Sequence, residues 1–192
     1  MNRGVEIRHE LMKSAIRVTS EQGLQNVTTK ALSMDSGFSE VYIYRYFRDK
    51  EDLLSQTFNF LDKELMYVMY KSLKTIDQSY TNVSSGFKLM FHDVWQFCLG
   101  DKDKCSFFIQ YYYSHYYLKH SEEKRKEIYQ PLLELISKVF GEKRDVWGEL
   151  NHMYDVIFPR LLRVIRGLTQ NVPELEESAY KELILENPSK CI

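Results

Sequence analysis

Three tyrosines, two arginines and one lysine fall within residues 42–50 of this 192-residue chain, in the segment YIYRYFRDK. A tyrosine combines a rigid apolar ring with a hydroxyl that can donate to a phosphate oxygen. An arginine can pair with a phosphate or with the edge of a guanine. So many rings and positive charges in so short a segment indicate a surface that contacts nucleic acid, although a solvated helix face with incidental rings would show the same composition.

The elements that carry this segment are expected to be helices. Four prolines and eight glycines interrupt the chain, and apolar residues recur every three or four positions, which predicts an all-α fold. A first helix ends at Gly23, and Thr28 caps a short second helix that closes at Gly37. Ser39 caps a third helix over about 40–47. The inner stripe of the first helix consists of Ile7, Leu11, Ala15 and Val18.

Two short helices joined at Gly37, with a longer helix before them, predict a helix-turn-helix, whose later helix enters the major groove. In the third helix Ile43 and Phe47 are one turn apart and, with Phe38, can anchor it to the core. That anchoring turns four side chains outward: Glu40, Val41, Tyr44 and Arg45.

Residues 7–58 resemble the DNA-binding domain of TetR-type transcriptional regulators. The family pattern runs alanine, glycine, threonine, a glycine before the turn, and then tyrosine-x-x-phenylalanine-x-x-lysine-x-x-leucine. This chain supplies it in order and spacing with Ala15, Gly23, Thr28, Gly37, Tyr44, Phe47, Lys50 and Leu53.

The resemblance implies roles for individual side chains. The residues that fall where the family reads bases are Glu40, Val41, Tyr42 and Arg45. Those that fall where it grips the DNA backbone are Thr29, Lys30, Tyr44, Tyr46 and Lys50, and the helix-capping Thr28 and Ser39 complete the expected DNA-binding set. Because one short helix contacts too few bases to be specific, a homodimer on a palindromic operator is expected.

We expect two domains. Residues 1–50 form the helix-turn-helix domain, a long helix from about 50 to 75 follows, and residues 51–192 form a helical domain for effector binding and dimerisation. An Asp49–Asp52 capping pair opens the long helix. The later helices are expected at about 83–99, 103–118, 122–140, 144–170 and 174–186, with a kink or split at Pro159.

The run FFIQYYYSHYY, residues 107–117, holds two phenylalanines and five tyrosines. Rings that encircle a helix cannot all face one neighbour, so some should line a pocket or an interface, although they could also form a core without a ligand. We expect an apolar or aromatic effector in a cavity between two helices. Its expected lining is Phe91, Trp95, Phe108, Tyr111, Tyr112 and His115.

The last two helices carry apolar stripes that could form a four-helix dimer interface, or pack within one chain. The residues expected at the interface are Ile157, Leu161, Ile165, Leu168, Ala179 and Leu183.

The chain carries 26 basic and 27 acidic residues, and residues 1–52 hold eight of each, so any basic footprint must be local. No apolar run approaches the roughly 20 residues that cross a bilayer, and the first residues do not resemble a secretory signal. We therefore expect a cytoplasmic protein without a membrane partner. Cys98, Cys105 and Cys191 have no paired spacing, so neither a zinc site nor a disulfide framework is expected.

We find no nucleophile–base pair, no phosphate-binding glycine loop and no cluster of metal ligands, so we expect neither an enzyme nor a cofactor. The sequence predicts a ligand-responsive transcriptional regulator, most simply a repressor. The main alternative is an effector-independent DNA-binding protein of the same fold, acting in replication, division or nucleoid organisation. A module that binds only other proteins is the third reading.

Overall fold

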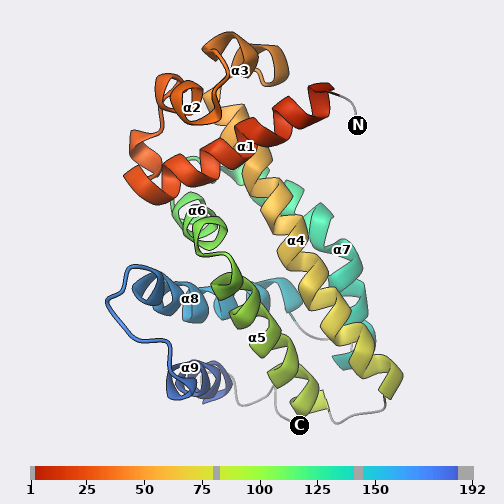
Figure 1. Ribbon diagram of the computed structural model, residues 1–192. Helices are drawn as coiled ribbons and strands as arrows, with labels where there is room; N and C mark the ends of the chain where they lie inside the picture. Colours follow the sequence, from red (N-terminus) through yellow and green to blue (C-terminus); the bar gives the residue numbers. More distant parts are fainter. Residues whose placement is uncertain (1–2, 80–82, 141–144, 186–192) are drawn as a thin grey trace. The chain divides into compact units, whose positions relative to one another are not determined.

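The computed structural model describes residues 3–79, 83–140 and 145–185, and within them all regular secondary structure is helical (Figure 1). The predicted all-α fold is therefore confirmed. In chain order the elements are α1 (Arg3–Gln22), the 3-10 helix η1 (Leu24–Asn26), α2 (Thr29–Ser36), α3 (Glu40–Tyr46), α4 (Lys50–Ser79), α5 (Val83–Gly100), α6 (Lys102–Tyr112), α7 (Lys119–Phe140), α8 (Val146–Ile165) and α9 (Pro173–Leu185).

The chain divides into two compact units. The first comprises Met1–Asp62 with Lys102–Glu123, and the second comprises Lys63–Asp101 with Lys124–Ile192. Residues 102–123, which we expected in the second domain, thus belong to the same unit as the N-terminal helices. No helix in the described parts of the chain is long and apolar enough to cross a membrane.

In the first unit, α1 packs against α2, η1 and α6 (Figure 1). The predicted stripe of Ile7, Leu11, Ala15 and Val18 is buried, with at most 5% of any of these side chains exposed. The helix ends before Gly23, whose φ of 86° is a conformation that only glycine adopts without strain. The apolar stripe of α1 therefore forms the floor on which the short helices lie.

Local capping fixes the ends of α2 and the start of α4. Thr28 Oγ1 accepts a hydrogen bond from the Ala31 N–H at 3.1 Å, and Gly37 closes α2 with a left-handed φ of 74°. At α4 the Asp52 N–H donates to Asp49 Oδ1 at 2.7 Å, while Asp52 Oδ2 accepts from the Arg48 N–H at 3.0 Å. The predicted capping pair is confirmed, and together these caps set the path of the chain into and out of α3.

In the second unit, α5, α8 and α9 contact one another. Trp95 of α5 and Tyr154 and Phe158 of α8 have no exposed surface, so large rings fill this core. α8 runs from Val146 to Ile165 without a split at Pro159, and the proline is exposed. Two predicted helices are shorter than expected: α6 ends at Tyr112 and α8 at Ile165.

Candidate nucleic-acid interface

The helix α3 is anchored from beneath and exposed above. Ile43 has no exposed surface and Phe47 is 3% exposed, as expected from their spacing of one turn. On the opposite face Val41 is 72% exposed and Tyr44 59% exposed. Glu40 and Arg45 are exposed beside them. One acidic, one aliphatic, one phenolic and one guanidinium group are therefore presented to solvent by a single turn and a half of helix.

The flank of α3 carries a row of rings. The rings of Phe38 and Tyr42 lie 5.5 Å apart, and those of Tyr42 and Tyr46 are stacked at 6.5 Å. The guanidinium of Arg45 lies 5.9 Å from the centre of the Tyr46 ring. Tyr42 and Tyr46 are half-buried, whereas Tyr44 is exposed, and the Tyr46 ring borders Arg45 on one side.

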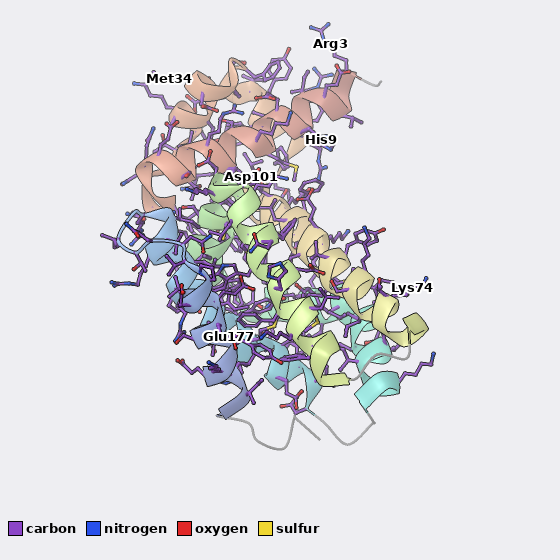
Figure 2. The ribbon with its side chains drawn as sticks, turned by 60° about the horizontal axis from the view of Figure 1, so that its bottom comes forward. Arg3, His9, Met34, Lys74, Asp101 and Glu177 are labelled. Atoms are coloured by element: carbon purple, nitrogen blue, oxygen red, sulfur yellow. The ribbon has the colours of Figure 1, made fainter. Side chains whose placement is uncertain are left out.

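The start of α2 lies in the same helix-turn-helix. Thr28 and Lys30 are exposed and Thr29 is half-buried. The first N–H groups of a helix lack partners within the helix, so this end favours an anion. A shallow groove of about 440 Å³ runs between α1 and α2, and Thr28 and Lys30 are among its lining residues. Met34 of α2 lines it too and projects into solvent, 77% exposed (Figure 2).

Ser39 stands immediately before α3, as expected for its capping residue. Its side chain is exposed but makes no capping hydrogen bond.

An ion-pair network ties α2 to α1. Arg17 Nε and Nη2 donate to the Asp35 carboxylate at 3.1 and 2.7 Å, and Arg17 Nη2 also reaches Glu10 at 2.8 Å. Partial burial alone would raise the pKa of Asp35, but hydrogen bonds from Arg17 and Ser14 and the charge of Arg17 outweigh it, so the pKa is lowered. The ionised carboxylate is thus the form that the fold stabilises.

Lys50 stands at the start of α4 and is half-buried. Its Nζ donates to the carbonyl oxygen of Val27 at 2.9 Å and to Tyr116 Oη at 3.5 Å. The same ammonium lies 5.8 Å from the centre of the Tyr116 ring. Lys50, which we expected to bind a phosphate, therefore also connects the start of α4 to Val27 and Tyr116 within the first unit.

Side chains of α6 form hydrogen bonds with the end of α1 and the start of η1. Gln110 Oε1 accepts from the Leu24 N–H at 3.0 Å, and its Nε2 donates to the Thr19 carbonyl at 3.3 Å. Ser20 Oγ donates to Asp103 Oδ1 at 2.6 Å. Sequence reasoning missed these contacts, although a lone amide in the middle of an aromatic run was a visible signal.

The six residues expected to line an effector cavity divide between the two units. Phe91 and Trp95 lie in the second unit and are at most 1% exposed. In the first unit, Phe108 and Tyr111 both stack on Phe58, with ring centres 4.7 and 4.6 Å apart. Tyr112 is half-buried and His115 is exposed. None of the six lines the groove between α1 and α2.

A buried cation that was not expected from the sequence lies in the second unit. Arg125 of α7 has no exposed surface, and its guanidinium carbon lies 4.6 Å from the ring centre of Tyr154 and 5.4 Å from that of Trp147. Arg125 Nη1 donates to Asn151 Oδ1 at 3.3 Å. Aromatic faces and a side-chain amide thus stabilise this charge between α7 and α8. Within the described residues no group of three potential metal-binding side chains occurs.

The residues expected at a dimer interface differ in exposure. Ile157, Leu161, Ala179 and Leu183 are at most 1% exposed within a single chain, as in the alternative of packing within one chain. Ile165 is half-buried, and Leu168 is 64% exposed. Because a fully buried side chain has no surface left for a partner, Leu168 is the member of this set best able to contact a second copy.

A helix-turn-helix with an exposed second helix, in a chain whose described residues form only helices, is the arrangement of a class of DNA-binding regulators. Residues 11–57 match the family model described as bacterial regulatory proteins, tetR family. A curated relative, the HTH-type transcriptional regulator HbdR from Aromatoleum sp. (strain CIB), is 30% identical over 93 residues, which cover 48% of this chain and 38% of that protein.

Solved structures resemble the whole fold. A TetR family regulator from Marinobacter aquaeolei VT8 has a TM-score of 0.75 at 16% identity, covering 94% of this chain and 95% of that one. FadR from Bacillus subtilis, solved in complex with stearoyl-CoA, has a TM-score of 0.66 at 17% identity, covering 92% and 97%. The segment 11–57 is therefore similar to the DNA-binding part of TetR-family transcriptional regulators, and the chain as a whole shares the fold of solved members of that family.

Proposed function

We propose that this regulator is a cytoplasmic repressor that binds a palindromic operator as a homodimer and is released by a small apolar effector. The main support for the proposal is the exposed face of α3, on which the side chains of Val41 and Tyr44 are largely accessible to solvent. Ile43 and Phe47, on the opposite face, are buried and anchor the helix to the core. Exposed apolar side chains on a helix of this kind are explained by contact with base edges and sugars.

The proposed interface has two parts. Glu40, Val41, Tyr42 and Arg45 face base edges from α3. The DNA backbone is held by tyrosines and lysines around them and by the start of α2, where free N–H groups favour a phosphate. This second set comprises Thr28, Thr29, Lys30, Ser39, Tyr44, Tyr46 and Lys50.

Selection of bound fragments from a random duplex library tests this proposal. The expected product is a near-palindrome whose half-sites lie about one helical turn, roughly 34–36 Å, apart. Arg48→Ala serves as a matched control, because Arg48 is an exposed arginine in the turn before α4 and already pairs with Asp52. Recovery of unenriched sequence, at low salt as well as at physiological salt, would reject specific DNA binding.

The effector is proposed to be apolar or aromatic, and an acyl-CoA, whose acyl chain is apolar, is the first compound to test. Two relatives of the same fold, FadR from Bacillus subtilis and FadR from Thermus thermophilus, were solved with stearoyl-CoA and lauroyl-CoA. An effector that prefers the conformation with misplaced reading helices lowers operator affinity, and operator DNA lowers effector affinity by the same factor. Titration of each ligand in the presence of the other measures both factors. Unaltered operator affinity across acyl-CoAs, aromatic acids and drugs would favour an effector-independent DNA-binding protein.

A further inference from the structure

We propose that Tyr116 is a positioning residue for operator binding, acting through Lys50 on the turn that precedes α2. This inference rests on the proposed function, because it concerns how the same interface is held. Tyr116 lies in the turn after α6, near the end of the aromatic run FFIQYYYSHYY, and is not one of the residues expected to line an effector cavity. The structure brings this turn into the first unit with the DNA-reading helices.

Three groups surround the ammonium of Lys50. Lys50 Nζ donates to the Val27 carbonyl at 2.9 Å and to Tyr116 Oη at 3.5 Å, and the Tyr116 ring centre lies 5.8 Å away. An ammonium is strongly hydrated, so a half-buried one stays in place only where protein groups replace its water. The hydroxyl and the ring of Tyr116 supply part of that replacement.

Val27 links Lys50 to the start of α2. It is fully buried and directly precedes Thr28, whose hydroxyl caps α2 and whose carbonyl accepts from the Leu32 N–H at 3.0 Å. By holding the Val27 carbonyl, Lys50 fixes the start of α2. Loss of Tyr116 lets the ammonium move toward water and loosens this start, where Thr28, Thr29 and Lys30 are proposed to meet a phosphate.

Tyr116 is itself held in place by its neighbours. Its carbonyl accepts from Tyr111 Oη at 3.3 Å, its N–H donates to Ser114 Oγ at 3.2 Å, and its ring stacks on Tyr111 at 6.3 Å. Tyr111 in turn stacks on Phe58 of α4. Tyr116 is therefore a rigid support for Lys50 and makes no proposed contact with DNA.

The test combines operator binding with a double-mutant cycle, using a duplex selected by the wild-type chain. Tyr116→Leu should weaken binding about threefold to tenfold, and Tyr116→Phe, which keeps the ring and loses the hydroxyl, about twofold to threefold. Neither should change the salt dependence, because no phosphate contact is lost. Tyr116→Leu should have no further effect in a Lys50→Met background. Tyr113→Leu, on the same turn and 55% exposed in the wild type, should bind normally.

A second measurement does not need DNA. Hydrogen exchange of the Ala31 and Leu32 amides, both bonded to Thr28, should be faster in Tyr116→Leu and Tyr116→Phe than in the wild type. The Gly37 amide at the other end of α2 should be unchanged. Unchanged exchange at Ala31 and Leu32 would overturn the inference, as would equal losses of affinity with and without Lys50. If no duplex is selected, the proposed function fails while the exchange measurement still decides the role of Tyr116.

Discussion

At the level of single residues, the exposed side chains of α3 differ in their hydrogen-bonding properties, so each can recognise a different feature of a base pair. Glu40 can only accept, so it suits the amino group of cytosine and repels phosphate. Arg45 can only donate, and Val41 can do neither. A side chain without polar atoms distinguishes base pairs through the methyl group of thymine.

Val41 is therefore expected to read a thymine methyl. Replacing single thymines of a selected operator by deoxyuridine removes only that methyl, and one replacement per half-site should weaken wild-type binding by about 1 kcal/mol. Val41→Ala should be insensitive to the same replacement, because its shorter side chain no longer reaches the methyl. Equal sensitivity of both proteins would show that another residue reads that position.

Arg45 is expected to contribute specificity, and the Tyr46 ring borders it on one side. Arg45→Ala should relax discrimination at one base position and cost about 1–3 kcal/mol on the preferred operator if the contact with guanine is bidentate. Binding measured across all four base pairs at each position checks this. A uniform loss on every sequence would instead assign Arg45 to the DNA backbone.

At the scale of elements, much could be predicted because short-range rules decide helix ends. The left-handed backbone at the end of α2 requires a glycine, which Gly37 supplies, and Thr28 caps the start of the same helix. The spacing of Ile43 and Phe47 determines which face of α3 is buried. The grouping of residues 102–123 with the N-terminal helices could not be predicted. It depends on rings far apart in the sequence, such as Phe58 and Tyr111, and no period within one helix encodes such a pair.

The link between α1 and α2 is expected to weaken in acid. Hydrogen bonds and the charge of Arg17 lower the pKa of Asp35 in the folded chain, although partial burial opposes them. A lowered pKa contributes stability above the unfolded value of about 3.9, and that contribution disappears as pH falls through the folded value. Asp35→Asn should therefore be less stable than wild type at pH 7, with the difference shrinking below about pH 4.

Urea denaturation at a series of pH values measures this difference. Glu21→Gln is the matched control, because Glu21 is an exposed carboxylate that lines the same groove as Asp35. A stability difference for Asp35→Asn that stays constant from pH 7 to pH 3 would mean that the carboxylate acts through packing and not through its charge.

At the scale of the whole molecule, the proposed function requires two copies of the chain, since one α3 contacts too few bases for specificity. Leu168 and Val172 are 64% and 39% exposed in the segment between α8 and α9. Burying two such side chains in a two-fold interface would remove apolar surface from water on both copies at once. Leu168→Glu should therefore favour the monomer, because dimerisation would bury a charge without a partner.

Sedimentation equilibrium of the full chain checks this prediction, with the wild type expected at twice the mass of one chain. Leu168→Glu should raise the dimer dissociation constant by at least about tenfold, given the cost of about 1.4 kcal/mol or more for burying a charge. Because operator binding then requires assembly on DNA, its dependence on protein concentration should become steeper. Leu118→Glu is the control, since Leu118 is 54% exposed but lies in the first unit. A dimer of unchanged stability in Leu168→Glu would exclude this segment from the interface and direct the search to other exposed faces of α8 and α9.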